Sequence, residues 1–330
     1  MEPESSRPHE HDRDILERAI LGQGDRFTAP EVAAEAGVTI DQARRLWRAL
    51  GFPEVIGEAY FTPADVEALS RIFAAVDAGT LDFEMAIALT RALGQTMSRL
   101  ADWEVATLVD RIEEMVDQEE SGSRVSAALR LVEEINHDFE TLLVYAWRRH
   151  LAAAVARVEA LGANEEDLHT TRVTVGFADI VHFTELTNKL GEDRIGDLVE
   201  IFEARCHDVV SNAGGRVIKS IGDSVLFVSD GAERGLEIAE GIINIIGRDP
   251  RMPDVRLGLA TGSVVTRLGD VFGPPVNMAA RLTAVARRNR IIVDQATADL
   301  LPRESFSVSR LPARPVRGFG VVEPVAVRRR

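Results

Sequence analysis

The stretch from Val173 to Glu185, with the sequence VTVGFADIVHFTE, constrains the fold of this chain most strongly. Large apolar side chains alternate with small residues over its first half, which is the period of a strand with one face in a core. The strand ends near Asp179, and the following residues favour a helix with Thr184 as its N-cap. The stretch therefore predicts a buried strand that delivers one carboxylate to a sheet edge. Taken alone, such an aspartate is more often a turn or cap residue.

The length and composition of the chain limit its class. Its 330 residues are enough for two domains. No apolar run approaches the roughly 20 residues that cross a bilayer, and the polar first residues do not form a secretory signal. The single cysteine, Cys206, excludes an intrachain disulfide and a cysteine-rich zinc site. We expect a cytoplasmic protein without membrane association. The formal net charge of -15 argues against a protein that mainly binds nucleic acid.

The first 160 residues are predicted to be nearly all helical and to form a regulatory domain. Threonines followed by Pro or Glu mark the helix starts near residues 28 and 62. Two short helices before residue 51 have the spacing of a helix-turn-helix motif. Further amphipathic helices are expected over about 82–93, 95–119 and 123–161. The predicted domains are residues 1–160, a connector over 161–171 and a second domain over 172–330.

The helix-turn-helix segment, with Arg44, Arg45 and Arg48 on its second helix, resembles the DNA-reading part of MerR-like regulators. One hypothesis is that the segment binds DNA. The other is that it is a helical interaction module that keeps the packing of the motif but does not bind DNA. The acidity of the chain favours the second hypothesis, so we do not expect DNA binding.

The second domain is predicted to follow the order βαββαβ, with extra strands at its end. A helix over about 193–212 precedes a hairpin that turns at Gly222-Asp223, and an amphipathic helix over 232–247 follows. A second hairpin is expected to turn at Gly262-Ser263. This order predicts a ferredoxin-like α+β fold, in which helices pack on one face of a mostly antiparallel sheet.

Asp223 lies in the turn of the first hairpin, within the segment KSIGDSVLF. Neighbouring strands lie about 5 Å apart, so a strand that ends at Asp179 and a hairpin tip at Asp223 can bring two carboxylates to one pair of cations. These segments contain no cysteine and only one histidine, which is too few for a zinc site, and oxygen ligands favour Mg²⁺ or Mn²⁺. Two such ions suit phosphoryl chemistry, because they activate an attacking oxygen and neutralise a leaving phosphate.

Three segments, FADIVHFT, KSIGDSVLF and GDVFGPPVNMAARL, closely resemble the signature blocks of the class III nucleotidyl cyclases, the adenylyl and guanylyl cyclases. The blocks occur in the order and spacing of that family, and the resemblance covers about residues 172–327. It implies that Asp179 and Asp223 bind two divalent cations, Mg²⁺ or Mn²⁺. It also implies that the backbone carbonyl of Ile180 helps to hold the second ion.

The resemblance implies further roles at positions that match the family motifs. Lys219 and Asp270 match the residues that contact adenine, whose edge offers a ring-nitrogen acceptor and an amino donor. Asn277 and Arg281 share a helix face and match the residues that orient the ribose and stabilise charge on the α-phosphate. Arg317 falls where many members have a lysine for the terminal phosphates. ATP is the implied substrate.

We therefore expect an adenylyl cyclase that converts ATP to 3′,5′-cyclic AMP and pyrophosphate at the interface of a homodimer. The arrangement also resembles soluble actinobacterial cyclases in which a helical N-terminal domain inhibits the catalytic domain and makes activity respond to pH. His137, His150 and His169 are the titratable candidates near the connector, although exposed histidines usually have no such role. The alternatives are a guanylyl cyclase, or a DNA-binding regulator whose cyclase-like domain only senses a nucleotide.

Overall fold

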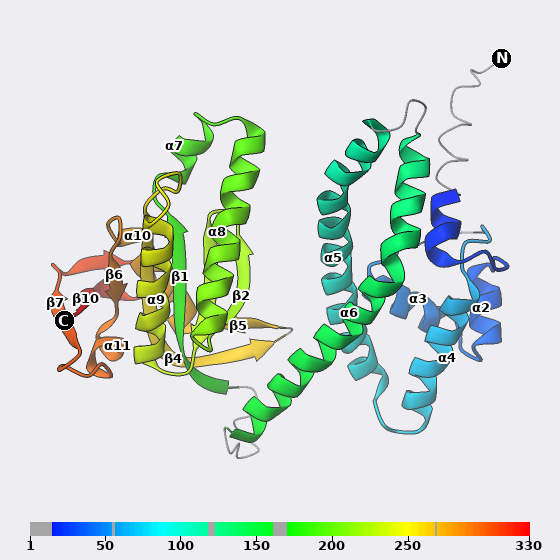
Figure 1. Cartoon of the computed structure of the whole chain (residues 1–330). Helices are drawn as coiled ribbons and strands as arrows, with labels where there is room; N and C mark the ends of the chain where they lie inside the picture. Colours follow the sequence, from blue (N-terminus) through cyan, green and yellow to red (C-terminus); the bar gives the residue numbers. More distant parts are fainter. Residues whose placement is uncertain (1–14, 55–56, 118–122, 161–169, 268) are drawn as a thin grey trace. The chain divides into compact units, whose positions relative to one another are not determined.

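The computed structural model describes residues 15–54, 57–117, 123–160, 170–267 and 269–330. The chain divides into two compact units, Met1–Ala154 and Val155–Arg330, and each is described by itself (Figure 1). Most of the predicted connector, together with His169, lies outside the described residues.

Three short helices of the N-terminal unit pack around a small apolar core. A threonine precedes each helix, and its hydroxyl and backbone amide both contact the side chain three residues further on. These capping boxes satisfy amide groups that a helix start leaves without partners. In the core, the ring of Trp47 stacks on Phe61 with centroids 4.2 Å apart. The helices are α2 (Ala29–Glu35), α3 (Ile40–Leu50) and α4 (Pro63–Asp77).

Two long helices follow: α5 (Phe83–Asp117) lies in this unit, and α6 (Arg124–Ala160) begins in it and continues past its boundary at Ala154. The predicted break near residue 94 is wrong, because α5 continues through Gly94. A Cβ at this glycine would lie 2.3 Å from the carbonyl oxygen of Leu50, so the glycine allows the end of α3 to approach. None of the helices in the described part of the chain combines the length and apolar content that a membrane span requires.

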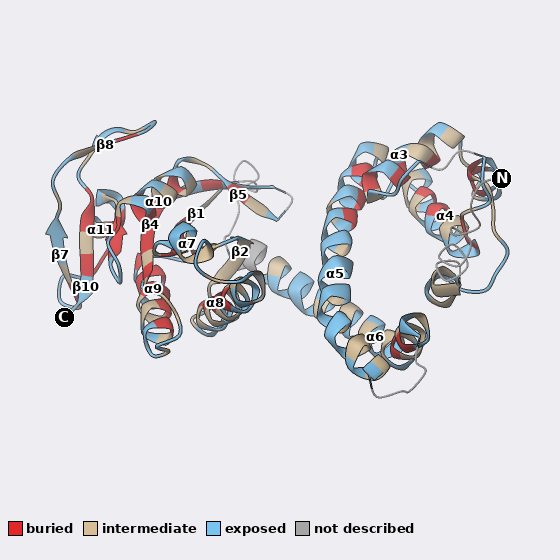
Figure 2. Ribbon diagram, turned by 90° about the horizontal axis from the view of Figure 1, so that it is seen from above, coloured by how far each residue is buried: buried red, intermediate tan, exposed pale blue. Residues whose placement is uncertain are grey.

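Both long helices expose many large apolar side chains, which we call the apolar surface of α5 and α6. Figure 2 shows that most of their length is exposed or half-buried. The side chains of this surface are Met85, Leu89, Leu93, Trp103, Val105, Val109, Leu142, Val144, Tyr145, Trp147, Leu151 and Val155.

The second unit contains an eight-stranded sheet in the order β2-β3-β1-β4-β6-β10-β7, with β5 paired to β4. Only the β4–β6 pair is parallel among the strand pairs of the described residues, so the prediction of a mostly antiparallel sheet is confirmed. The strands of this sheet are β1 (Thr170–Ile180), β2 (Arg216–Ile221), β3 (Ser224–Ser229), β4 (Val255–Arg267), β5 (Asp270–Phe272), β6 (Ile291–Val293), β7 (Phe306–Arg310) and β10 (Val325–Arg329). Two further strands, β8 (Arg314–Val316) and β9 (Gly320–Val322), pair with each other.

Helices cover both faces of this sheet, so the expectation of one covered face is wrong. Alternate residues of β1 point to opposite faces: Ala178 joins the core under α8 and α9, whereas Val175 joins a second core that includes Ala279 of α10. The α+β class and the βαββαβ order are confirmed. The helices are α7 (Phe183–Thr187), α8 (Glu192–Asn212), α9 (Ala232–Gly247), α10 (Pro274–Val285) and α11 (Gln295–Asp299).

The second hairpin turns later than predicted. β4 runs without a break through Gly262 and Ser263, and the chain reverses near Gly269, whose φ of 78° is a left-handed conformation. A Cβ at Gly262 would lie 2.7 Å from the ring of Pro275, so this glycine gives α10 close access to the strand. The turn that starts β5 therefore comes directly before Asp270, one of the predicted site residues.

Candidate active site

Two predicted metal ligands meet at the end of β1. Asp179 is the penultimate residue of the strand and lies opposite Ser224, whose hydroxyl donates a hydrogen bond to Asp179 Oδ1 at 2.5 Å. The backbone amide of Ile180 donates to the carbonyl oxygen of Asp223 at 3.0 Å, which fixes the β2–β3 turn beside β1. Burial and then the negative charge of Asp179 raise the pKa of the Asp223 carboxyl above its usual value. The structure thus brings together two carboxylates that repel each other.

Arg256 is a site residue that the sequence did not reveal. It lies opposite Asp179 in the β1–β4 register, and its guanidinium donates to Asp179 Oδ2 from Nε at 2.7 Å and from a terminal nitrogen at 2.5 Å. The only signal in the sequence was a charged residue between the apolar residues of a strand. In this structure the guanidinium neutralises one carboxylate of the pair.

The donor set at this position fits hard divalent cations. Among the described residues, no group of three or more His, Cys, Asp and Glu side chains could hold a metal by itself. Asp179, Asp223 and the carbonyl of Ile180 provide a partial oxygen shell, and Mg²⁺ commonly completes such a shell with water and substrate phosphates. Arg256 already occupies Asp179 Oδ2, so a cation at this carboxylate would replace the guanidinium as its partner.

The turn after β1 differs from the prediction. The N-cap of α7 is His182, in the left-handed conformation with a φ of 59°, and Thr184 lies inside the helix. The strand therefore changes to helix within two residues. This turn and Asp223 line a cleft of about 740 Å³, which Arg256, Arg287 and Arg288 also line.

The two residues predicted to contact adenine also meet. Lys219 Nζ donates to Asp270 Oδ2 at 2.5 Å, although the two residues are 51 positions apart in sequence. β5 brings Asp270 to the end of β2, and the backbone amide of Val271 donates to its other carboxylate oxygen at 2.9 Å. Both side chains are partly exposed, so a ligand can reach them.

The other three predicted residues are exposed. Asn277 and Arg281 lie on α10, and Arg317 lies in the turn between β8 and β9. In the described part of the chain, the side chains of these three residues form no hydrogen bond or ion pair. The single chain therefore assembles a carboxylate pair and a Lys–Asp pair, and it leaves the remaining site residues open to solvent.

Comparisons with known proteins show the family of this chain. The profile described as "Adenylate and Guanylate cyclase catalytic domain" matches residues 166–327. An adenylate cyclase of Streptomyces coelicolor is 38% identical, over 99% of this chain and 93% of its own length. The chain belongs to the adenylate and guanylate cyclase family.

Other members of this family show how far the similarity extends. A protein of Mycobacterium tuberculosis named a pH-sensitive adenylate cyclase is 28% identical, over 96% of this chain and 81% of its own length. The crystal structure of the catalytic core of a rhodopsin-guanylyl cyclase is 24% identical, with a TM-score of 0.46, over 49% of this chain and 97% of that one. The sequence similarity to the adenylate cyclases thus includes the helical unit of this cyclase.

The arginines of the helix-turn-helix segment of this cyclase contact other residues of the same chain. Arg45 lies 2.6 Å from Glu84 of α5, and its guanidinium stacks over the ring of Phe83 at 4.7 Å from the centroid. Arg48 Nε donates to the carbonyl oxygen of Arg44 at 3.4 Å. The contacts of Arg45 tie α3 to α5, and the bond of Arg48 stays within α3. Both occupy side chains that a DNA-reading helix would direct to phosphates.

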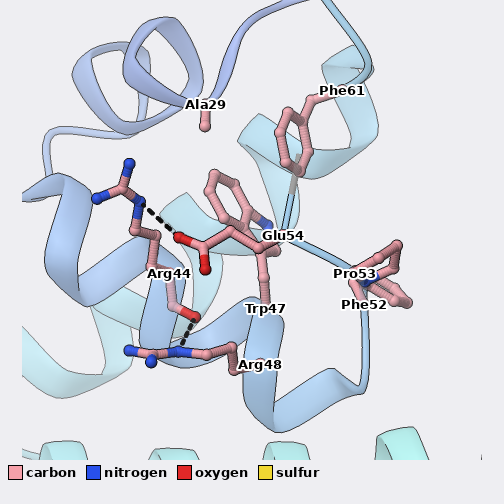
Figure 3. Close-up of a pocket in the computed structure, with 8 residues that line it drawn as sticks. All are labelled: Ala29, Arg44, Trp47, Arg48, Phe52, Pro53, Glu54 and Phe61. Atoms are coloured by element: carbon pink, nitrogen blue, oxygen red, sulfur yellow. Dashed lines mark hydrogen bonds and ion pairs between the residues drawn. The ribbon is translucent and has the colours of Figure 1, made fainter. Parts of the chain in front are cut away.

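Arg44 closes a small cavity beside the aromatic stack of this segment (Figure 3). Its Nε lies 3.5 Å from Glu54, and both side chains line the cavity with Trp47 and Phe61. The indole nitrogen of Trp47 is buried and has no hydrogen-bond partner among the described residues. The cavity volume of about 10 Å³ holds about one water molecule, and a water there would satisfy this nitrogen.

Proposed function

We propose that this chain is a cytoplasmic, homodimeric adenylate cyclase that converts ATP to 3′,5′-cyclic AMP and pyrophosphate. The observation that carries the choice of substrate is the contact between Lys219 and Asp270. The ammonium group can only donate hydrogen bonds and the carboxylate can only accept them. Adenine needs this combination at its edge, because its ring nitrogen accepts and its amino group donates.

Asp179, Asp223 and the carbonyl of Ile180 would hold two divalent cations, Mg²⁺ or Mn²⁺. When bound, these ions would make the ribose 3′ oxygen a better nucleophile and neutralise charge on the phosphates. Arg256 would lose its role as the partner of Asp179 and could then pair with a phosphate oxygen.

Two residues on α10 would act on the reacting part of ATP. Asn277 would orient the ribose, and Arg281 would donate hydrogen bonds to the α-phosphate oxygens as negative charge develops there. The bond from the 3′ oxygen to the α-phosphorus forms while the bond to the bridging oxygen breaks. The hydroxyl proton passes to solvent and pyrophosphate leaves. No side chain of the described site is required as a dedicated base in this scheme.

Exposure of the α10 residues supports a site shared by two chains. Asn277 and Arg281 have no partners among the described residues, as expected if they complete a site on a second copy. Arg317 would reach the terminal phosphates. A two-fold axis would generate two equivalent sites, because every site residue is present in each chain. The apolar surface of α5 and α6 provides additional area that a second copy could bury.

Purified full-length protein with Mn²⁺ provides the direct test of substrate. We expect cyclic AMP and pyrophosphate from ATP at a rate at least about 100-fold above that of cyclic GMP from GTP, since a mismatched polar edge leaves buried groups unpaired. Lys219→Ala should lose most of this preference, whereas Lys189→Ala, an exposed lysine outside the site, should keep it. Faster formation of cyclic GMP would favour the guanylyl cyclase alternative, and equal rates would contradict the proposed preference for adenine.

We further propose that the helical domain, residues 1–160, is autoinhibitory and makes activity depend on pH through the connector over 161–171. The similarity to a cyclase named pH-sensitive supports this proposal. So does the continuity of α6, a 37-residue helix that carries His137 and His150 and ends shortly before β1. A movement of α6 would reach the strand that holds Asp179.

The regulatory proposal can be tested by comparing the full chain with residues 165–330 from pH 5.5 to pH 8. We expect the shorter chain to be more active, with a flatter pH profile, because it lacks the inhibitory helices. Equal activities and equal profiles would contradict the proposal, provided that circular dichroism shows both proteins to be folded.

A further inference from the structure

The cleft beside the carboxylate pair contains a concentration of positive charge that the family motifs do not account for. Arg256, Arg287 and Arg288 all line it, on a chain whose formal net charge is -15. The Arg256 guanidinium donates a hydrogen bond to Asp179. The other two follow the end of α10 and precede β6.

Neither of these two arginines is strongly bound within the chain. Arg288 lies 3.7 Å from Asp254 in a long ion pair whose arginine is largely exposed and whose carboxylate is half-buried, so this pair contributes little to stability. The Arg287 side chain is exposed, and in the described part of the chain it forms no hydrogen bond or ion pair. An unpaired guanidinium in a cleft lined by other arginines is in an electrostatically unfavourable place, unless an anion binds there.

We propose that Arg287 and Arg288 form a subsite for the terminal phosphates of the substrate and for the departing pyrophosphate. This proposal rests on the proposed cyclase function. The two arginines belong to the same chain as Asp223 and line the same cleft, so they would act on the cation side of the site. Arg317, in contrast, lies in the β8–β9 turn and does not line this cleft among the described residues.

The chemistry of the reaction requires such a subsite. Breaking the bond between the α- and β-phosphates leaves pyrophosphate, which carries several negative charges, and planar guanidinium groups bind phosphate oxygens in a bidentate manner. Arg287 should contribute more than Arg288, because Arg288 would first have to leave Asp254. Both are positioning residues for the phosphate tail, so the ribose and the α-phosphorus should still react when they are removed.

The experiment compares four full-length variants with the wild type: Arg287→Ala, Arg287→Lys, Arg288→Ala and Arg303→Ala. Arg303 is an exposed arginine of the same unit that does not line the cleft, so it is the matched control. Binding of inorganic pyrophosphate in the presence of Mn²⁺ is measured by calorimetry. The KM for ATP and the kcat are measured separately on the same preparations.

We expect Arg287→Ala to weaken pyrophosphate binding and to raise the KM for ATP about tenfold each, with kcat changed less than threefold. Arg288→Ala should show a smaller change in the same direction. Arg287→Lys should recover part of the affinity, and Arg303→Ala should match the wild type. Wild-type affinity for pyrophosphate and wild-type KM in Arg287→Ala would overturn the proposal.

Failure of the cyclase function would give a different result. A wild-type chain that binds pyrophosphate more tightly than Arg287→Ala, but forms no cyclic nucleotide, would support the subsite and reject the proposed function. An active wild type with unchanged binding in Arg287→Ala would reject only the subsite.

Discussion

The two units of this chain differ in what they lack. The catalytic unit has apolar cores on both faces of its sheet, but the predicted site residues Asn277 and Arg281 are exposed. The N-terminal unit has a small core around α2 to α4 and satisfies its helix starts with capping boxes, but α5 and α6 expose large apolar side chains. The catalytic unit thus has predicted site residues without partners, and the long helices have the longer series of exposed apolar side chains.

A second copy of the chain could supply both. Exposed aromatic and aliphatic groups on a helix lower the free energy of association when they are buried, at roughly 25 cal/mol per Å² before the costs of binding. In the proposed dimer, Asn277 and Arg281 would act only when the partner brings the rest of the site to them. The comparison therefore predicts separable effects: changes in the catalytic unit alter chemistry, and changes on α5 and α6 alter assembly.

The largest expected effect is the loss of turnover in Asp179→Ala. The substitution removes half of the carboxylate pair, so we expect activity to fall by more than about 1,000-fold, the scale of losing a main source of transition-state stabilisation. The chain should still fold, but its free energy of unfolding should fall by about 1–3 kcal/mol, because the Ser224 hydroxyl and the Arg256 guanidinium lose a buried acceptor. Cyclic AMP formation and thermal unfolding check both expectations.

Asp230→Ala is the control for this prediction, since Asp230 is exposed and its ion pair with Arg234 is long, at 3.9 Å. We expect this variant to keep full activity. Undiminished turnover in Asp179→Ala would show that Asp179 is not a metal ligand. It would also contradict the expectation that changes in the catalytic unit alter the chemistry.

The next largest effect is structural and concerns a glycine in each unit. A Cβ at Gly258 would lie 2.3 Å from the backbone nitrogen of Thr283, and one at Gly94 would lie 2.3 Å from the carbonyl oxygen of Leu50. Each neighbour is backbone and cannot move alone, so alanine should destabilise its own unit by about 2–3 kcal/mol. Chemical denaturation followed by circular dichroism measures the loss.

Gly196→Ala is the matched control, because this helical glycine in α8 has no atom within 4 Å of an added Cβ. We expect it to stabilise the chain by about 0.5–1 kcal/mol. If Gly94→Ala lowers the stability of the catalytic unit as much as that of its own unit, the two units do not unfold independently and the comparison fails.

The sequence predicted elements with clear local signals better than contacts between them. Threonine caps and alternating apolar residues predicted α2 to α4 and β1, and family motifs identified the Lys219 and Asp270 pair before the structure showed their contact. Gly94 and Gly262 were interpreted as breaks because a glycine has the same local signal in a turn and at a close crossing. Only the structure distinguishes the two uses.

The features of the site that the sequence did not predict have the same explanation. Arg256 contacts Asp179 across two paired strands, and no local pattern in either strand indicates that register. The left-handed conformation of His182 also went unpredicted, because residues other than glycine rarely adopt it and no local pattern signals it. Tertiary contacts thus decided the parts of the site that sequence patterns could not.

A smaller effect is expected from Trp147, which is 59% exposed on α6. Trp147→Ser removes a large apolar group from the proposed dimer contact, so we expect the dimer dissociation constant to rise about tenfold. The helix content should not change, because the side chain has little to pack against in one chain. Sedimentation velocity over a concentration series measures the association.

Phe52→Ser is the control for this measurement, because Phe52 is similarly exposed but lies near the helix-turn-helix segment rather than on α5 or α6. We expect its dissociation constant to equal that of the wild type. A wild-type dissociation constant for Trp147→Ser would show that the apolar surface of α5 and α6 is not part of the dimer contact. This surface would then have to bind something other than a second copy.

The smallest effect concerns Arg45, which separates the two hypotheses for the helix-turn-helix segment. Its contacts with Glu84 and Phe83 are exposed, so Arg45→Ala should lower stability by only about 0.5–1 kcal/mol. If the segment is an interaction module, neither the wild type nor this variant shifts duplex DNA in a gel at modest salt. A shift by the wild type that Arg45→Ala weakens, and that falls steeply with added salt, would instead show phosphate contacts. In that case the intramolecular ion pair would have to open on binding, and DNA would compete directly with the contact that ties α3 to α5.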